Sequence, residues 1–362
     1  MGYECLEQGR LEGECRRRDP AGYFVHIDNL PFSVPPLPSH PMPRRHSAPL
    51  PDFIPPQLAQ LADSAPEGDA WLHEVKIDGY RVAAGIARGK VRMFTRRAND
   101  WTPRFRPIAV ILAELPVKAA YIDGEVAVLT AEGVSDFGAL QETLGRRGRS
   151  RELAFIAFDL LHLDGRDLRR LPLIERKAIL AKLLAKLPAR SPIQFSDHVT
   201  GQGPAFFALA CKRHLEGIIS KRVAAPYRSG RASDWVKVKC TSRQEFVIGG
   251  YRHEVGGRPN LGALLLGYFN RGRLTYAGSV GTGWTIQLGR SIMAALQCIG
   301  RESPPFIAVP RADAKDAKWA EPQLVCEVEF TQWTRDGRAR QPAFKGLRED
   351  KAPREVRRET PK

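Results

Sequence analysis

Short β-rich runs dominate the chain from about Trp71 onward, and they constrain its fold more than any other feature of the sequence. Gly, Asp and Asn separate these runs, as turns separate strands. The runs are WLHEVKIDGYRVAAGIA, KVRMFTR, AYIDGEVAVL and LAFIAFDLLHL. Helices are predicted in LIERKAILAKLLAKL, whose apolar residues recur at the helical period, and in AFFALACKRHLEG. Strands and helices mixed in this way predict an α+β domain.

After Cys240 a second series of strands is joined by glycine-rich turns. These strands are FVIGGYR, GALLLGYF, LTYAGSV and QLVCEVEFTQW, and a helical piece lies near SIMAALQCI. In the last strand Cys326 and Val328 alternate with Glu327 and Glu329, which is the period of a half-buried strand. Several short strands in succession predict a small β-barrel, and an oligonucleotide-binding (OB) barrel suits a basic chain.

The charge balance favours a polyanionic partner. The 362 residues include 56 Lys and Arg against 40 Asp and Glu, a formal net charge of +16. Nucleic acid is the commonest partner for such a surplus, although a solvated charged face is the simpler alternative. No apolar run approaches the roughly 20 residues of a membrane span, and the N-terminus lacks the apolar core of a signal peptide. We therefore expect a cytoplasmic protein that does not enter a membrane.

Proline sets the first 49 residues apart from the rest of the chain. The stretch LPFSVPPLPSHPMPRRHSAPLP removes backbone donors and breaks helices, so we expect a disordered lead-in. Met42 lies inside it and is a second candidate for the start of translation.

The cysteines are scattered and form no C-x-x-C pair. Neither a zinc site nor a disulfide framework is predicted, and we expect reduced thiols. They are Cys5, Cys15, Cys211, Cys240, Cys298 and Cys326.

The stretch HEVKIDGYR places Lys76 two residues before Asp78 in a strand-like run. In an extended segment both side chains would point into the same space, and Gly79 would let a backbone or a ligand approach closely. DWVKVKC repeats this geometry with Lys237 and Lys239. Two like charges on one strand face are unfavourable unless an anion lies between them, which suits a phosphate site.

Carboxylates complete the group of candidate site residues. Asp123 and Glu125 share a strand face in YIDGEV, and Glu216 follows a helix in HLEGIISK. Each of these short motifs alone is explained as well by a solvated strand or a turn. A central lysine, further lysines and carboxylates occurring together indicate phosphoryl chemistry with a divalent metal.

The order of the motifs resembles that of the ATP-dependent DNA ligases, which are covalent nucleotidyltransferases. The motifs are KIDG, FTRRAND, YIDGE, FDLLHLDG, LEGIISK and DWVKVK, followed by RQPAFKGLREDK. The last of them, with Arg348, Asp350 and Lys351, resembles the R-x-D-K motif that ends the family's OB-fold domain. The chain is most similar to the ligase domain of bacterial non-homologous end-joining enzymes of the LigD type. The similarity covers residues 50–355.

The resemblance implies a domain order. Residues 1–49 would be the lead-in, and 50–240 an ATP-grasp-like adenylation (nucleotidyltransferase) domain. Residues 241–350 would form the β-barrel OB-fold domain, and 351–362 a basic tail. The hinge between the two domains would lie just after Lys239.

The resemblance also implies a reaction in three steps. Lys76 would attack the α-phosphate of ATP, AMP would pass to a DNA 5′-phosphate, and a 3′-hydroxyl would displace AMP and seal the nick. An ammonium cannot attack, so the pKa of Lys76 must fall. We expect burial and the positive charges of Lys237, Lys239 and a metal to lower it.

Further roles are implied by the resemblance alone. Glu74 would read the adenine and Phe158 would stack on it, while Arg81, Arg96 and Glu125 would hold ribose and phosphate. Asp78 and Glu216 would bind metal, and Glu216 would also contact the nucleotide. Lys237 and Lys239 would bind the α-phosphate. Arg348, Asp350 and Lys351 would reach the pyrophosphate on domain closure, and Arg146, Arg147 and Arg149 would form a loop on the DNA backbone, where a solvated loop is the alternative.

The implied cofactors are ATP and Mg²⁺ or Mn²⁺, and the implied substrate is nicked or broken duplex DNA. A Ku-like end-binding protein and separate polymerase and nuclease modules are the implied partners of a monomer in the bacterial cytoplasm, associated with the nucleoid. Three alternatives remain. An NAD-dependent ligase would carry a four-cysteine zinc module that these residues lack. The others are an RNA ligase or capping guanylyltransferase and a non-catalytic nucleic-acid binder.

Overall fold

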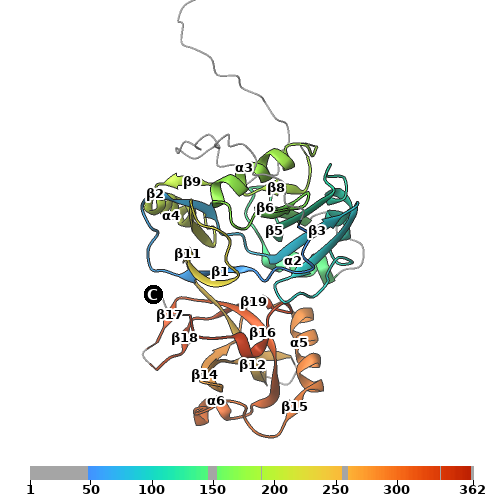
Figure 1. The fold of residues 1–362 in the computed structure, drawn as a ribbon. Coiled ribbons are helices and arrows are strands. Elements are labelled where there is room, and N and C mark those ends of the chain that lie inside the picture. The colour runs from blue at the N-terminus through green and yellow to red at the C-terminus, as the bar shows by residue number, and fades with distance from the viewer. Residues whose placement is uncertain (1–47, 146–152, 189, 255–259, 335, 360–362) are drawn as a thin grey trace, which may run out of the picture.

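The computed structural model describes residues 48–145, 153–188, 190–254, 260–334 and 336–359. Two lobes lie one above the other in Figure 1, the first blue to yellow and the second orange to red. No helix within the described ranges is long and apolar enough to cross a membrane. The predicted loop of Arg146, Arg147 and Arg149 lies outside these ranges, as does nearly all of the 1–49 lead-in.

The first lobe is built on two sheets. A five-stranded sheet has the order β1-β11-β10-β2-β9, and a six-stranded sheet has the order β4-β3-β5-β6-β7 with β8 added to β6. The first consists of β1 (Gln57–Leu61), β11 (Gly230–Lys239), β10 (Gly217–Arg222), β2 (Gly68–Val75) and β9 (Val199–Gly201). The second consists of β4 (Lys90–Thr95), β3 (Tyr80–Ala87), β5 (Ala119–Val128), β6 (Leu153–Leu163), β7 (Arg166–Asp167) and β8 (Ile193–Phe195).

Four helices accompany these sheets. They are α1 (Arg106–Leu112), α2 (Phe137–Gly145), α3 (Leu173–Leu184) and α4 (Gly203–Lys212). Strands β6 and β8 are parallel, and α3 supplies the crossover that parallel strands require. Leu180 and Leu183 of α3 enter the main hydrophobic core, together with Val82 of β3 and Phe155 of β6. Burial of these apolar faces fixes α3 against the six-stranded sheet.

The second lobe wraps one sheet around its own core. The sheet order is β14-β13-β12-β16-β15, and β19 pairs with β16. The strands are β12 (Ser242–His253), β13 (Leu261–Asn270), β14 (Arg273–Val280), β15 (Gly300–Arg301), β16 (Lys318–Phe330) and β19 (Ala343–Leu347). The hairpin β17 (Gln332–Trp333) and β18 (Ala339–Arg340) stands apart from this sheet. The lobe has the OB fold that the sequence predicts.

Helical elements of the second lobe are α5 (Ile286–Cys298), α6 (Arg311–Ala314) and the 3-10 turn η3 (Pro353–Glu355). Thr285 caps α5, because its side chain accepts from the backbone N–H of Leu288. The core contains Ile292 and Leu296 of α5, packed with residues of the sheet such as Phe246. A separate core in each lobe explains why the glycine-rich strands after Cys240 form a unit of their own.

The helices and most strands expected from the sequence are confirmed, with limits that differ by a few residues. Predicted helices at 173–187, 205–217 and near 291–299 correspond to α3, α4 and α5. The helices α1 and α2 were not predicted from the sequence. A continuous extended run through Lys76 is wrong, because the chain leaves β2 after Val75 and crosses to the other sheet before β3 begins at Tyr80.

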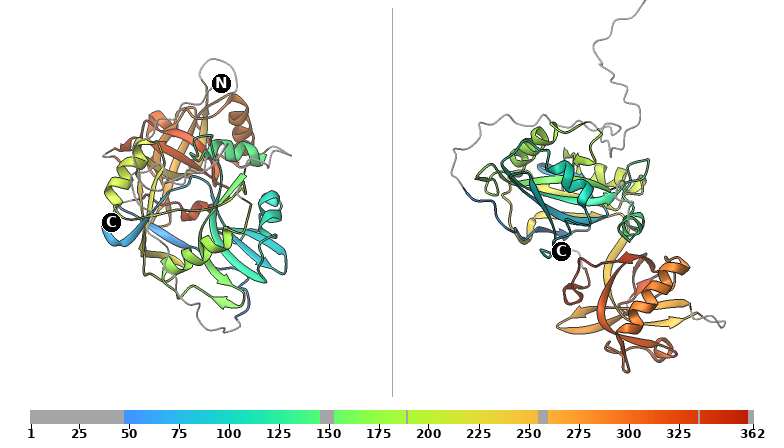
Figure 2. Two further views of the ribbon diagram at one scale, coloured as in Figure 1. Left: turned by 90° about the horizontal axis from the view of Figure 1, so that it is seen from above. Right: turned by 90° about the vertical axis from the view of Figure 1, so that its right-hand side faces the viewer.

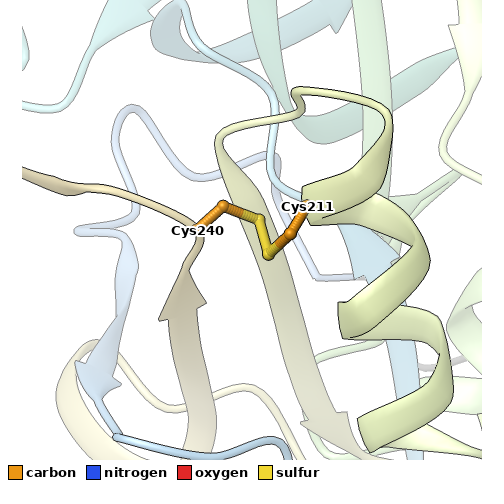
Figure 3. Close-up of a disulfide and its surroundings, with 2 residues drawn as sticks. All are labelled: Cys211 and Cys240. Carbon is orange, nitrogen blue, oxygen red and sulfur yellow. A yellow bond between two sulfur atoms is a disulfide. The ribbon is translucent and has the colours of Figure 1, made fainter.

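The expectation that all thiols are reduced is also wrong. Figure 3 shows Cys211, near the end of α4, joined to Cys240, which directly follows β11. The Cα atoms of the two cysteines lie 5.1 Å apart. A separation of 29 residues in sequence gives no sign of this proximity, which arises because α4 packs beside β10 and β2. Of the described cysteines, Cys298 and Cys326 are free thiols.

The chain passes from one lobe to the other between β11 and β12, as the right-hand view of Figure 2 shows. Further contacts join the lobes at a distance from this passage. Gln141 of α2 donates to the carbonyl of Leu347 in β19, and Arg104 donates to Glu349 across 2.6 Å. The lobes therefore meet through polar groups from several elements.

Candidate active site

Lys76 lies where the chain crosses between the two sheets of the first lobe. Its backbone N–H donates to the carbonyl of Gly217 at 2.9 Å, and that of Asp78 donates to the Ser135 hydroxyl at 2.9 Å. A Cβ at Gly79 would lie 2.3 Å from the carbonyl oxygen of Val126. Only glycine fits there, so the crossing is held close to β5 and the side chain of Lys76 is aimed by its anchored backbone.

The ammonium of Lys76 pairs with Glu216. Its Nζ lies 2.5 Å from Oε2, and the two side chains are 21% and 4% exposed. Burial acts to lower the pKa of Lys76, but Glu216 and Asp78 outweigh burial and the pKa is raised. The expectation that burial, Lys237 and Lys239 lower the pKa of Lys76 is therefore wrong for this arrangement. Without a nucleotide, Lys76 is a protonated lysine with a proton acceptor already in contact.

A cavity of about 120 Å³ opens beside Lys76. Its walls come from both sheets and include Phe158 of β6 and Trp235 of β11, whose ring centroids lie 6.0 Å apart in an edge-to-face arrangement. Glu74, Arg81 and Glu125 also line it. Two aromatic rings with charged groups around them suit a planar heterocycle attached to a phosphate.

Glu74 is buried at the wall of this cavity and is fully paired. Lys177 donates to Oε1 at 2.6 Å, Lys221 donates to Oε2 at 2.7 Å, and the Ser196 hydroxyl donates to Oε2 at 3.2 Å. Burial would raise the pKa of Glu74, but Lys177 and Lys221 lower it overall. The carboxylate is therefore held as an anion in one orientation.

Arg81 is held just as firmly by Asp123. Its Nε and Nη2 donate to the two carboxylate oxygens at 3.1 and 2.6 Å, and its guanidinium lies over the rings of Phe158 and Trp235. Glu125 of β5 lies directly opposite Arg81 of β3, and burial raises the pKa of its carboxyl to about 8. A neutral Glu125 can donate as well as accept a hydrogen bond near pH 7.

Buried carboxylates gather on the side of Lys76 that faces the second lobe. Asp78 accepts from Arg243 of β12 at 2.7 Å, and Arg243 also approaches Glu327 of β16 at 3.3 Å. Burial, Glu216 and Glu327 raise the pKa of Asp78 to about 7, against the opposing effect of Arg243. The alternation in β16 predicts that Glu327 faces solvent, but its side chain is buried and pairs with Arg243 and Arg348.

The carboxylates fit the divalent metal that the sequence predicts. Oε1 of Glu216 is buried and accepts no hydrogen bond from any residue that the structure describes. A cation near Glu216 and Asp78 would satisfy that oxygen and relieve the repulsion that raises the pKa of Asp78. Among the described residues there is no ready-made group of three or more His, Cys, Asp or Glu ligands. Such a cation would therefore draw further ligands from phosphate oxygens and water, as Mg²⁺ commonly does.

Lys237 and Lys239 share one face of β11, as predicted, and an anion lies between them. That anion is the carboxylate of Glu359, with Oε1 at 2.6 Å from Lys237 Nζ and Oε2 at 3.0 Å from Lys239 Nζ. Burial and the nearby ammonium of Lys239 lower the pKa of Lys237 to about 8.

The R-x-D-K residues of the second lobe face the first lobe. Arg348 donates to both oxygens of Asp350 at 2.9 Å and lies over the rings of Tyr80 and Phe137. Lys351 donates to Glu245 at 2.7 Å. Arg348 is also close enough to Glu125 to act on the pKa of that carboxyl.

Arg96 lines a neighbouring hollow with Phe94, and Arg81 lines both this hollow and the cavity beside Lys76. The guanidinium of Arg96 lies 3.8 Å from the carboxylate of Glu355. Several other groups at the site were not predicted from the sequence. These are Lys177, Ser196, Arg243 and Glu359, none of which lies in a motif. Lys221 and Trp235 lie within LEGIISK and DWVKVK but were not singled out.

A lysine paired with a carboxylate, beside an aromatic cavity and opposite an OB-fold lobe, defines a nucleotidyltransferase. Comparison with known proteins makes this more specific. The family model for the ATP dependent DNA ligase domain matches residues 56–239, and that for the ATP dependent DNA ligase C terminal region matches 257–351. The chain belongs to the ATP-dependent DNA ligase family.

Two curated relatives illustrate the similarity. The multifunctional non-homologous end joining protein LigD of Pseudomonas aeruginosa is 42% identical over 317 residues, covering 86% of this chain and 37% of that protein. LigD of Mycobacterium bovis is 36% identical over 312 residues, covering 85% and 40%. The chain thus spans less than half the length of these relatives. A solved structure of mycobacterial DNA ligase D complexed with ATP and MES matches with a TM-score of 0.64 and 36% identity, covering 85% of this chain and 99% of that one.

Proposed function

We propose that this protein seals nicks in duplex DNA, joining a 5′-phosphate to a 3′-hydroxyl with ATP, in DNA repair by end joining. The observation that carries the proposal is the contact between Lys76 and Glu216, 2.5 Å long, at the edge of a cavity lined by Phe158 and Trp235. Membership of the ATP-dependent DNA ligase family supplies the substrate class. The end-joining role rests on the similarity to LigD.

In the first step, Lys76 Nζ attacks the α-phosphate. Glu216 Oε2 is in contact with the ammonium and accepts a proton from it, which frees the lone pair of the nitrogen. A bond forms between Nζ and phosphorus, the bond from phosphorus to the pyrophosphate oxygen breaks, and pyrophosphate leaves. Lys76 loses this proton against the effect of Glu216 and Asp78, which raise its pKa, and a cation held by these carboxylates would offset their charge.

The adenosine occupies the cavity beside Lys76. The adenine stacks on Phe158, and Trp235, which meets Phe158 edge to face, lines the same cavity. Lys177 and Lys221 keep Glu74 ionised, so its carboxylate accepts a hydrogen bond from the amino group of adenine. Arg81 and Glu125 line the part of the cavity nearest the ribose and phosphate. Arg96 reaches the nucleotide only after a rearrangement of its side chain.

The phosphates lie toward the second lobe. Lys237 and Lys239 bind the α-phosphate and neutralise the charge that develops in the transition state. Asp78 and Glu216 would hold Mg²⁺ or Mn²⁺, which would supply further charge neutralisation when bound. Arg348 and Lys351 approach the leaving pyrophosphate when the lobes close, and Asp350 orients Arg348 through two hydrogen bonds.

We assign the first lobe to an adenylation domain at 50–240 and the second to an OB-fold domain at 241–350, with the hinge after Lys239. Opening at this hinge admits DNA for the later steps. The net charge of +16 favours the DNA backbone, and the loop of Arg146, Arg147 and Arg149 is proposed to contact it. A Ku-like protein and separate polymerase and nuclease modules are the proposed partners of a monomeric, cytoplasmic enzyme on the bacterial nucleoid.

A nick-sealing assay tests this function. Duplex DNA with a single labelled nick is incubated with the protein, Mg²⁺ or Mn²⁺, and either ATP or NAD. We expect the wild type to seal the nick with ATP and not with NAD, and Lys76→Ala to seal it with neither. A matched substrate with ribonucleotides on both sides of the nick separates DNA from RNA ligation. Efficient sealing of RNA but not of DNA would overturn the proposal.

A further inference from the structure

Glu359 occupies the place where two lysines would receive phosphate. Its carboxylate bridges Lys237 and Lys239 at 2.6 and 3.0 Å, and its side chain is 21% exposed. Two oxygens held between two ammonium groups reproduce what a phosphate offers the same lysines. The reaction itself assigns no role to this residue.

The segment that carries Glu359, residues 353–359, is attached to the second lobe. Val356 is buried in the core of that lobe, and its carbonyl accepts from the backbone N–H of Phe269 at 2.9 Å. Gln244 of β12 then holds the next residues, donating to the carbonyl of Arg357 at 3.2 Å and accepting from the N–H of Glu359 at 2.9 Å. The backbone thus delivers Glu359 from one lobe to lysines on the last strand of the other.

The pKa of Glu359 indicates how strongly Lys237 and Lys239 stabilise its ionised carboxylate. Burial would raise the pKa of Glu359, but Lys239 and Lys237 outweigh burial and lower it to about 2. Glu359 is therefore ionised throughout the range in which the enzyme works. A nucleotide that binds the two lysines must displace a charged partner and not only water.

We propose that Glu359 is an autoinhibitory phosphate mimic, which occupies the Lys237–Lys239 site between catalytic cycles and competes with the phosphates of ATP. This proposal rests on the proposed role of the two lysines in binding phosphate. No covalent bond forms or breaks in the exchange. The carboxylate leaves as the phosphates enter, and returns after pyrophosphate and AMP have gone.

Two consequences follow from competition at one site. The apparent affinity for ATP is the intrinsic affinity multiplied by the fraction of molecules in which Glu359 has left the two lysines. The maximal rate of lysine adenylation is unaffected, because a saturating nucleotide displaces the carboxylate completely. Glu359 also joins the two lobes through Lys237 and Lys239, so its release lowers the cost of opening the hinge.

The test is Glu359→Gln, which keeps the size of the side chain and removes its charge. Glu321→Gln is the matched control, because Glu321 also pairs with a basic side chain of the second lobe, Arg301 at 3.4 Å, and does not line the cavity shared by Lys239 and Glu359. The initial rate of labelling by α-³²P-ATP is measured against ATP concentration for the wild type and both variants. We expect the KM for ATP to fall about 3- to 10-fold in Glu359→Gln, with kcat for adenylation and the control unchanged.

A second measurement does not depend on catalysis. Binding of α,β-methylene-ATP, an analogue whose α-phosphate cannot be transferred, is measured with Mg²⁺ by calorimetry, and Glu359→Gln should bind it about 3- to 10-fold more tightly than the wild type. An unchanged or weaker affinity, or a higher KM, would overturn the mimic. Failure of the wild type to be labelled by ATP would instead overturn the proposed function, while tighter binding of the analogue by the variant would still support the mimic.

Discussion

Arg243, the second residue of the OB-fold lobe's first strand, donates to Asp78 in the loop that carries the candidate nucleophile, with 2.7 Å between Nη1 and Oδ2. The same guanidinium approaches Glu327, so one arginine lies between a carboxylate of each lobe. All three side chains are nearly inaccessible to solvent. The relative position of the lobes is thus coupled to the charge state of the loop beside Lys76.

Replacing Arg243 with methionine should weaken the contact between the lobes. Two buried carboxylates would lose their shared partner, and we expect the free energy of unfolding to fall by about 3 kcal/mol, the lower end for a broken buried pair. Arg252→Met is the control, because Arg252 lies on the same strand and donates only to Ser279 of its own lobe, at 3.3 Å. Its cost should stay below about 1 kcal/mol. Denaturant unfolding measures both, and equal losses would contradict this role of Arg243.

Asp78 should make stability depend on pH. Its pKa is raised from an ordinary 3.8 to about 7, first by burial and then by Glu216 and Glu327. Between these two pH values the folded protein keeps a proton that the unfolded chain releases. The free energy of unfolding therefore falls as the pH rises through this window, by at most about 1.4 kcal/mol per pH unit. Above about pH 7 the dependence ends.

Asp78→Asn, which cannot titrate, isolates this effect. The unfolding free energies of the wild type and the variant should diverge between pH 4 and about 7, with the wild type losing more as the pH rises. Glu329→Gln, on a half-buried carboxylate, should leave the pH dependence of the wild type unaltered. A constant difference between wild type and Asp78→Asn across this range would refute the raised pKa.

Lys177 should control nucleotide binding without touching the nucleotide. It is wholly buried and fixes Glu74 at 2.6 Å, and it donates also to the carbonyl of Ser196. In Lys177→Met the carboxylate keeps Lys221 but loses half of its charge compensation. We expect about 3 kcal/mol of lost stability and a roughly 10-fold higher KM for ATP.

Lys182→Met provides the comparison for Lys177, since Lys182 lies on the exposed side of the same helix. Adenylation kinetics are measured at a temperature where both variants are folded. A KM for ATP in Lys177→Met equal to that of the control would limit Lys177 to a purely structural role.

Local pattern was sufficient to predict the elements whose residues are contiguous. The helical period of 173–187 predicted α3, and the glycine-rich strands after Cys240 predicted a separate β lobe. The shared face of Lys237 and Lys239 followed from the two-residue period of a strand, and both lysines do contact one anion.

Relations between distant residues could not be predicted in this way. Glu74 and Lys177 are 103 residues apart and meet only because α3 crosses between β6 and β8. Cys211 and Cys240 meet because α4 lies beside the five-stranded sheet. The pattern at Lys76 misled for another reason, because a change of sheet between β2 and β3 looks like one long strand in sequence.

The identity of the nucleophile is the central claim, and covalent labelling tests it most directly. Purified protein is incubated with α-³²P-ATP and Mg²⁺ or Mn²⁺, separated on a denaturing gel, and the labelled peptide is identified by mass spectrometry. We predict one AMP per chain, attached to Lys76 Nζ and absent from Lys76→Ala, while Lys182→Met is labelled like the wild type. A folded protein, shown to be free of bound AMP, that stays unlabelled or carries AMP on another residue would contradict the account.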